Sequence, residues 1–391
     1  MFAYYILRFI HKKPNICIKN SHVHNKARVL FTILAIQNFL MKKVLFFITA
    51  ASLFSCKEEE KKDFKASFNN ISIDTLLQEE ISIRAISIDK EANLAWYAGS
   101  NGKYGWVVLN EGKNFSGVAA QDTLLPEFRS LTITKDAAFI VSAGTPALLY
   151  KVTKNGKQTK LVYTETGEKV FYDSMQFRND KEGIAVGDPT GKCLSIITTA
   201  DGGETWKKIP CSQIPVAADG EAAFAASNTN LVVKGDETWI VSGGKKSRIY
   251  YSANKGKSWR VYNTPIVQGR EMTGAFSVDF YDDKIGFAVG GDLDQLTKKS
   301  GNKMLTEDGG KTWKLTGENT GFGYASCVQF LPGSNGDELI TVGPSGIYYS
   351  YDRGSSWKKL ADDKSLHTIR FKDNKTAVAA GQNKIVKLRF K

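Results

Sequence analysis

The sequence predicts a single all-β domain, a seven-bladed β-propeller whose blades are successive sequence repeats. Two observations predict this fold: a short apolar strand ending in glycine recurs seven times, and a turn motif ending in tryptophan recurs four times. A third observation agrees with them. No convincing amphipathic helix follows residue 63, and every expected strand is short.

The first repeat is a run of small and apolar residues that closes on a glycine. The spacings between successive copies are 45, 43, 56, 47, 53 and 38 residues, with the glycines at Gly99, Gly144, Gly187, Gly243, Gly290, Gly343 and Gly381. Such a period suits a blade of four strands. The last repeat leaves no room for an outer strand, and residues 67–76 alternate in polarity as a strand does. We therefore expect this N-terminal strand to close the last blade and hide a sheet edge.

The second repeat is the turn pattern S/T-x-D/N-x-G-x-S/T-W, at residues 199–206, 252–259, 306–313 and 350–357. In such a turn the Asp or Asn side chain accepts hydrogen bonds from backbone N–H groups, and the glycine adopts a positive φ. The tryptophan packs beneath the hairpin. We therefore expect a structural role, and no catalytic one, for Asp201, Asn254, Asp308 and Asp352.

The N-terminus predicts export and lipid attachment. A basic start at Met41 is followed by about ten apolar residues, too few to span a bilayer, and then by the lipobox-like sequence LFSC. We expect four parts: an upstream extension outside the fold (1–40), a lipoprotein signal peptide (41–55), a charged tether (56–66) and the propeller (67–391). Cys56 would carry the lipid, which would place the protein on the outer membrane. The charged run after Cys56 also resembles a cell-surface export signal.

Charge and residue usage exclude several classes of function. The formal charge of +13 belongs mostly to residues 1–55, which hold eight basic and no acidic residues; the rest has 45 basic and 40 acidic ones. We therefore expect no nucleic-acid partner. Only His367 remains of the histidines after residue 55, and the cysteines form no CxxC pair, so we expect no metal and no cofactor. Cys193 and Cys211 could pair, but we interpret them as buried thiols.

The turns and the strands together resemble the BNR/Asp-box propellers, which include sialidases, xyloglucanase-type hydrolases and sortilin-like receptors. The closest resemblance is to the photosystem II stability/assembly factor-like lipoproteins of non-photosynthetic bacteria. It covers nearly all of the mature chain and is carried by a blade pattern seen at Phe177–Trp206 and Phe280–Trp313. This resemblance implies a binding or assembly platform and no enzyme.

One column of the aligned repeats suggests a ligand site. Four residues before the first apolar position of six repeats, the sequence places Arg84, Arg129, Asp173, Phe276, Ser326 and His367, with Glu221 near the same place in the fourth repeat. The innermost strands of a propeller line its central channel, so these side chains could ring the channel mouth. Two arginines beside carboxylates could hold an anionic group or a peptide. The alternative interpretation is a set of salt bridges between blades.

We thus expect a monomeric, non-catalytic envelope lipoprotein that binds a protein partner or assists assembly. No catalytic residue is assigned. The alternative is a cell-surface glycoside hydrolase or glycan-binding propeller, because a glycosidase needs only two carboxylates about 5–10 Å apart. Fold alone does not decide between the two.

Overall fold

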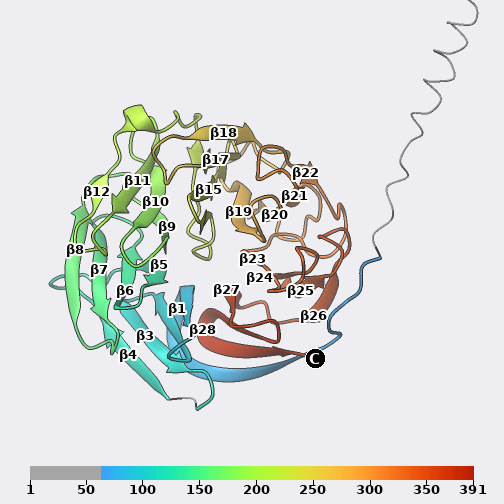
Figure 1. Ribbon diagram of the computed structural model, residues 1–391, viewed down its shortest axis with the longest axis horizontal. Helices are drawn as coiled ribbons and strands as arrows, with labels where there is room; N and C mark the ends of the chain where they lie inside the picture. Colours follow the sequence, from blue (N-terminus) through green and yellow to red (C-terminus); the bar gives the residue numbers. More distant parts are fainter. Residues whose placement is uncertain (1–62, 112) are drawn as a thin grey trace, which may run out of the picture. The chain divides into compact units, whose positions relative to one another are not determined.

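The computed structural model describes residues 63–111 and 113–391, and its strands form a ring of sheets around a central axis (Figure 1). The strands belong to six hydrogen-bonded sheets. Among the described residues the one helix is a short 3-10 turn, η1 (Cys211–Gln213). No described helix is long and apolar enough to cross a membrane.

The bounds of the strands follow the order of each sheet. The sheet that contains both ends of the described chain is β27 (Leu366–Phe371), β28 (Thr376–Phe390), β1 (Ile71–Asp89), β2 (Leu94–Gly99), β3 (Lys103–Val108) and β4 (Asn114–Val118). Two four-stranded sheets follow: β5 (Phe128–Ile133), β6 (Ala137–Ser142), β7 (Ala147–Thr153) and β8 (Thr159–Glu165), then β9 (Tyr172–Phe177), β10 (Gly183–Pro189), β11 (Leu194–Thr199) and β12 (Lys207–Lys208).

The second half of the chain forms the other three sheets. The first comprises β14 (Leu231–Lys234), β15 (Glu237–Val241), β17 (Arg248–Ser252) and β18 (Arg260–Asn263). The next has six strands, β13 (Glu221–Ala222), β16 (Gly243–Gly244), β19 (Thr273–Phe280), β20 (Gly286–Asp292), β21 (Lys303–Thr306) and β22 (Lys314–Leu315). The last comprises β23 (Cys327–Phe330), β24 (Leu339–Gly343), β25 (Gly346–Ser350) and β26 (Lys358–Ala361).

The all-β propeller fold is confirmed, but the prediction of seven blades is wrong: the strands form six sheets. The inner strands contact one another around the axis in the order β1, β5, β9, β14, β19, β23 and β27. However, β1 is one continuous strand of 19 residues, which pairs with β28 through residues 71–82 and with β2 through residues 83–89. No glycine or proline interrupts it, so the first and last repeats merge into one sheet.

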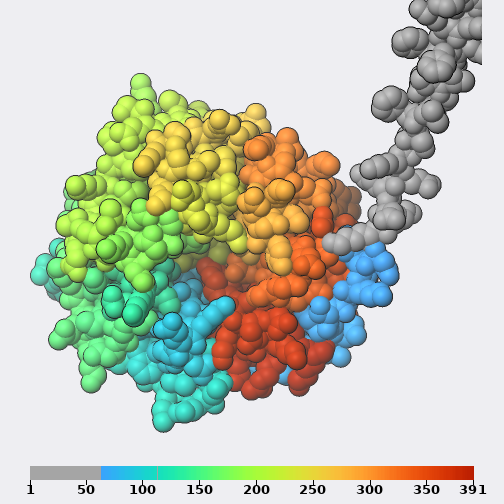
Figure 2. Space-filling view, viewed as in Figure 1, coloured from blue at the N-terminus to red at the C-terminus, as the bar shows by residue number. Residues whose placement is uncertain are grey.

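The predicted pairing of the N-terminal strand with the end of the chain is present. Ile71 lies opposite Phe390, and the ladder continues to Ser82 opposite Gln382. In the space-filling view the first described residues (blue) lie beside the last ones (red) (Figure 2). Main-chain hydrogen bonds between the first and the last strand of the described chain therefore hold the ring closed.

In six of the seven repeats the glycine marks a close approach of two backbones, whereas a Cβ added at Gly144 would meet no described atom within 4 Å. At Gly187 in β10, an added Cβ would lie 2.1 Å from the carbonyl oxygen of Phe171, and at Gly381 in β28 it would lie 1.9 Å from that of Ser365. Any larger residue would push the second strand of the sheet away from the start of the inner strand. At these six positions the glycine thus reflects steric necessity.

The core consists of apolar layers between neighbouring sheets. Phe139 of β6 stacks on Phe177 of β9 with ring centroids 4.7 Å apart, and Trp239 of β15 stacks on Phe280 of β19 at 4.0 Å. Both pairs join adjacent sheets, so each sheet is stabilised mainly by its neighbours.

Cys193 and Cys211 form a disulfide, so the interpretation of these two residues as buried thiols is wrong. Cys327 is a buried free cysteine. The predicted extension (1–40), signal peptide (41–55) and lipidation site Cys56 lie outside the described residues, as does most of the tether (56–66).

Candidate functional site

The strand directions define two ends of the ring. In the sheet of β5 to β8, the inner strand begins with Phe128 and Arg129, and successive strands are antiparallel. The loops after the second and fourth strands therefore lie at the end where the inner strands begin, and the loops after the first and third strands lie at the opposite end. We call the end where the inner strands begin the entry face.

A cavity of about 750 Å³ opens on the entry face, and we call it the cup. It brings together four of the five residues predicted for a channel-mouth site: Arg84, Arg129, Glu221 and His367. Its other main side chains are Asp188, Phe224, Glu271, Met272, Phe276, Leu293, Leu296, Tyr324 and Lys364. The structure thus assembles the predicted column at one place, although the fifth residue, Asp173, is not in the lining.

The floor of the cup is a segment that crosses the central axis, residues 223–230. Its side chains bind inner strands on several sides: Asn228 Nδ2 donates to the Leu131 carbonyl in β5 at 2.7 Å, and Thr229 Oγ1 donates to Ser277 Oγ in β19 at 2.7 Å. Thr368 Oγ1 of β27 donates to the Ser227 carbonyl at 3.1 Å. These bonds fix the segment across the channel, so the cavity is closed on one side.

The two arginines are held by this floor. Arg84 Nη1 donates to the Ala226 carbonyl at 3.2 Å, and Arg129 Nη1 donates to the Ala225 carbonyl at 3.4 Å. Arg129 also pairs with Glu127 at 2.9 Å, whereas the Nε of Arg84 is buried and has no hydrogen-bond partner among the described residues. Burial lowers the pKa of Arg84, and Arg129 adds to this effect. Two positively charged guanidinium groups thus repel each other inside one cavity. An anion bound between them would relieve this repulsion.

His367 lies beside these arginines. Burial lowers its pKa to about 3, and the positive charges of Arg84 and Arg129 contribute. The imidazole is therefore neutral at physiological pH and serves as a hydrogen-bonding side chain without charge.

Two aspartates lie on the same side of the cup, and burial raises the pKa of both. Asp173 is fully buried, and neither of its carboxylate oxygens has a hydrogen-bond partner in the described part of the chain. The nearby Asp188 raises the pKa of Asp173 further, while Arg129 lowers it. Asp188 lines the cup, accepts a bond from Ala223 N at 2.8 Å and has a pKa of about 6. Burial thus favours the protonated form of Asp173, which lies out of a ligand's reach, whereas Asp188 can change charge near neutral pH.

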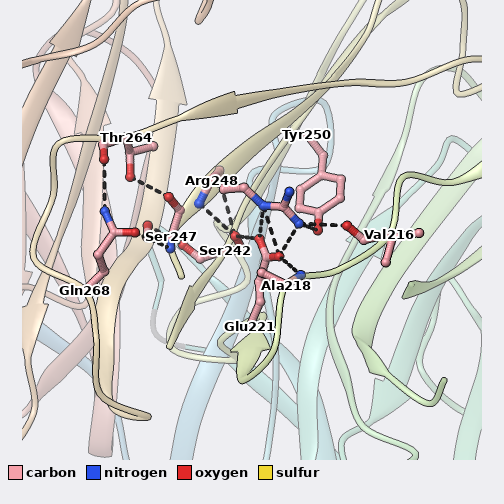
Figure 3. A network of polar contacts seen from close by, with 9 residues as sticks. All are labelled: Val216, Ala218, Glu221, Ser242, Ser247, Arg248, Tyr250, Thr264 and Gln268. Carbon is pink, nitrogen blue, oxygen red and sulfur yellow. Dashed lines mark hydrogen bonds and ion pairs between the residues drawn. The ribbon is translucent and has the colours of Figure 1, made fainter. Parts of the chain in front are cut away.

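Glu221 forms a buried ion pair with Arg248 (Figure 3). Its side chain is 0% exposed, and Arg248 donates to both of its carboxylate oxygens. Ser242 Oγ and Ala218 N complete the coordination of this carboxylate at 2.5 and 2.7 Å. Arg248 also donates to the Val216 carbonyl at 2.9 Å. Glu221 therefore fixes the loop that forms this wall of the cup, which corresponds to the salt-bridge alternative considered above.

A second wall of the cup is aromatic, and it was not assigned to a site from the sequence. Phe224 and Phe276 stack with centroids 3.9 Å apart and planes 7° apart, and Tyr324 packs edge-on against Phe276 at 4.9 Å. Met272 and Leu296 extend this wall and are each 41% exposed. Phe276 stood in the predicted column, but a single aromatic residue there did not distinguish a binding wall from core.

The four motif turns lie at the end opposite the cup, because each follows the third strand counted outward from the inner strand of its sheet. In the first of them, Asp201 accepts bonds from Thr199 Oγ1, Thr205 N and Thr205 Oγ1 at 2.8, 3.0 and 2.6 Å. The same pattern recurs at Asp308 and Asp352, and Asn254 repeats it with its amide. The side chains of these four residues form their hydrogen bonds within their own turns, and these bonds stabilise the turns.

No group of three or more His, Cys, Asp or Glu side chains that could hold a metal ion occurs in the described part of the chain.

No family model matches the sequence. A curated xyloglucanase from a Paenibacillus species is 24% identical over 216 residues, which cover 45% of this chain and 20% of that protein. The chain thus matches about a fifth of the length of this relative.

Solved structures share the propeller fold at low sequence identity. A structure described as YCF48 bound to D1 peptide has a TM-score of 0.59 at 13% identity, covering 84% of this chain and 99% of its own. YCF48 from Cyanidioschyzon merolae has a TM-score of 0.58 at 14% identity, covering 82% and 98%. The GH74 xyloglucanase from Xanthomonas campestris has a TM-score of 0.56 at 13% identity, covering 81% and 53%. The similar proteins thus include a peptide-bound propeller and a glycoside hydrolase.

Proposed function

We propose that this protein is a non-catalytic propeller of the cell envelope that binds a peptide segment of a protein partner in the cup. One observation carries the proposal: the cup has a cationic side formed by Arg84, Arg129 and Lys364 and an aromatic side formed by Phe224 and Phe276. A peptide that combines an anionic group with apolar side chains satisfies both sides at once.

The availability of carboxylates argues for binding without hydrolysis. A glycosidase needs one carboxyl group as acid and a second one as base or nucleophile, both in contact with the substrate. Glu221 is fully coordinated by Arg248, Ser242 and Ala218, and Asp173 is buried below the surface of the cup. Of Asp173, Asp188 and Glu221, only Asp188 can therefore contact a ligand.

We also propose export and lipid attachment at Cys56, followed by outer-membrane localisation. The disulfide between Cys193 and Cys211 supports export, because disulfides persist in oxidising compartments such as the periplasm. The four motif turns, with their shared hydrogen-bond pattern, support placing the chain among the BNR/Asp-box lipoproteins that its sequence resembles. One structural neighbour is bound to a peptide, which supports a peptide as the occupant.

A second candidate function is glycan binding or hydrolysis, favoured by the similarity to two xyloglucanases. In that case Asp188, whose pKa of about 6 suits a general acid, would act next to the aromatic wall. This candidate requires a second carboxylate within reach, and Glu271 on the rim of the cup is the available one.

Selection from a random peptide library on the immobilised protein tests the proposal, in parallel with a glycan array that includes xyloglucan oligosaccharides. We expect the library to yield peptides with an acidic group next to apolar residues. Their affinity, measured by calorimetry, should fall at least tenfold in each of Arg84→Ala and Arg129→Ala, because each replacement removes a charged contact of about 1.5–3 kcal/mol.

Phe115, which lies away from the cup, provides a matched control: Phe115→Leu should leave the affinity unchanged. The proposal is wrong if no peptide is selected while xyloglucan fragments bind or are cleaved. It is also wrong if selected peptides bind equally well after both arginines have been replaced.

A further inference from the structure

A second cavity, of about 770 Å³, adjoins the cup, and we call it the side groove. It shares five lining residues with the cup: Phe171, Asp188, Gly220, Glu221 and Ala222. From there it passes between the loops around Gly144, Lys169, Gly191 and Val216. All of these loops belong to the entry face, so the two cavities form one continuous depression.

We propose that the side groove is a second subsite, which holds the extended polypeptide chain leading away from the group bound in the cup. This inference rests on the proposed function and adds to it the direction and extent of the bound peptide. It also assigns a role to a surface that the predicted site residues do not cover.

The lining of the side groove suits a polypeptide backbone. Seven of its positions are glycine, alanine or proline: Gly144, Pro189, Gly191, Ala217, Ala218, Gly220 and Ala222. Small residues leave main-chain groups within reach of a ligand, so binding would depend little on the ligand's side chains. Lys169 and Lys192 are exposed, and they form no ion pair within the described part of the chain.

The same lining is poorly suited to a polysaccharide. Stacking of successive sugar rings requires exposed aromatic faces along the path of the chain. Phe171 is the one aromatic side chain that lines the side groove, and it lies at the junction with the cup. An extended peptide is therefore the occupant that we infer.

The walls of the side groove are fixed before a ligand binds. The disulfide joins Cys193, next to Lys192, to Cys211 at the start of the segment that leads to Val216. Ala217 N donates to the Lys192 carbonyl at 2.8 Å, and the ion pair of Glu221 with Arg248 holds the far end of that segment. A preformed groove loses little conformational entropy on binding, which raises affinity for a long peptide.

Gly191 offers a way to block the side groove without disturbing the fold. An added Cβ at Gly191 would meet no atom within 4 Å, and its backbone is not in the left-handed region that favours glycine. Gly191→Trp should therefore fold normally and place a large ring in the groove, and Gly191→Ala is the matched control with the same backbone.

The test uses a selected twelve-residue peptide and a truncated form of it that keeps only the four residues needed for the cup. In the unaltered protein, we expect the long peptide to bind at least tenfold more tightly than the short one. Gly191→Trp should abolish this difference and leave the short peptide's affinity unchanged, whereas Gly191→Ala should preserve the difference. Reduction of the disulfide, monitored by thiol titration, should weaken the long peptide more than the short one.

The outcomes separate the inference from the function on which it rests. If the short peptide binds as tightly as the long one, or Gly191→Trp leaves the difference intact, the side groove is not a subsite and the cup alone binds the peptide. If xyloglucan oligosaccharides compete for the groove and the peptide extension does not, the inferred occupant is wrong. If no peptide is selected at all, the proposed function fails and the inference fails with it.

Discussion

Replacement of Glu221 by alanine should destabilise the fold strongly, because it leaves a buried positive charge without its partner. The Glu221 side chain is 0% exposed and that of Arg248 is 16% exposed, so water screens their interaction little. Removing one member of such a pair costs about 3–5 kcal/mol. The carboxylate also accepts bonds from Ser242 and Ala218, whose donors would lose their partner as well.

The expected change can be measured by urea unfolding and by thermal unfolding, both followed through tryptophan fluorescence. For a domain of this size the entropy of unfolding is roughly 0.7 kcal/mol per degree, so a loss of about 3–5 kcal/mol corresponds to a Tm lower by about 4–7 °C. Asp219→Ala is the matched control on the same loop. Its side chain is 96% exposed and lies 3.6 Å from Lys245, so its removal should cost less than about 1 kcal/mol.

A double-mutant cycle shows whether the charge pair itself is responsible. When Arg248→Ala is added to Glu221→Ala, no unpaired charge remains, so the combined loss should be clearly smaller than the sum of the two single losses. Strict additivity, or a loss below about 1 kcal/mol for Glu221→Ala, would show that the pair does not fix this loop.

Three further predictions concern other parts of the molecule. Because the pKa of Asp188 is about 6, an anionic peptide should bind more tightly at pH 5, where the carboxyl group is protonated, than at pH 7.5; calorimetry should find this dependence lost in Asp188→Asn. Asp308→Ala should destabilise the fold by about 1–2 kcal/mol in urea unfolding, because its turn loses charge-assisted bonds, and Asp308→Asn should cost less. Replacing Cys193 and Cys211 together by serine should lower the free energy of unfolding by about 3 kcal/mol, as expected for a closed loop of 18 residues; unchanged stability would contradict a role for this disulfide in holding the loop.

Local repeats predicted the strands well, because each repeat records a local steric demand. Six of the seven glycines mark places where two backbones meet, and the motif turns carry their own hydrogen-bond acceptors, so both features can be recognised in the sequence. The blade count failed for a non-local reason. Whether residues 71–89 form two strands or one depends on their partners β28 and β2, which lie at distant positions in the chain.

The sequence predicted part of the cup and missed the rest. The column that contains Arg84, Arg129 and His367 was visible because inner strands begin at equivalent positions of each repeat. Residues 223–230 have no counterpart in other repeats, so no alignment could place them across the axis. One signal did exist: the interval of 56 residues between Gly187 and Gly243 is the longest of the series. The disulfide and residues 223–230 both fall within this interval.

The closed axis limits how any ligand can bind. Because residues 223–230 are bonded to inner strands on several sides, a chain that enters the cup cannot pass through the ring and leave at the end that carries the motif turns. A bound peptide must therefore end in the cup or turn back on the entry face, where the side groove shares a wall with the cup. This geometry favours chain ends and exposed loops of a partner over the interior of a folded domain. A peptide cyclised through its two ends should accordingly bind only when the ring is wide enough to present its acidic and apolar residues as a loop.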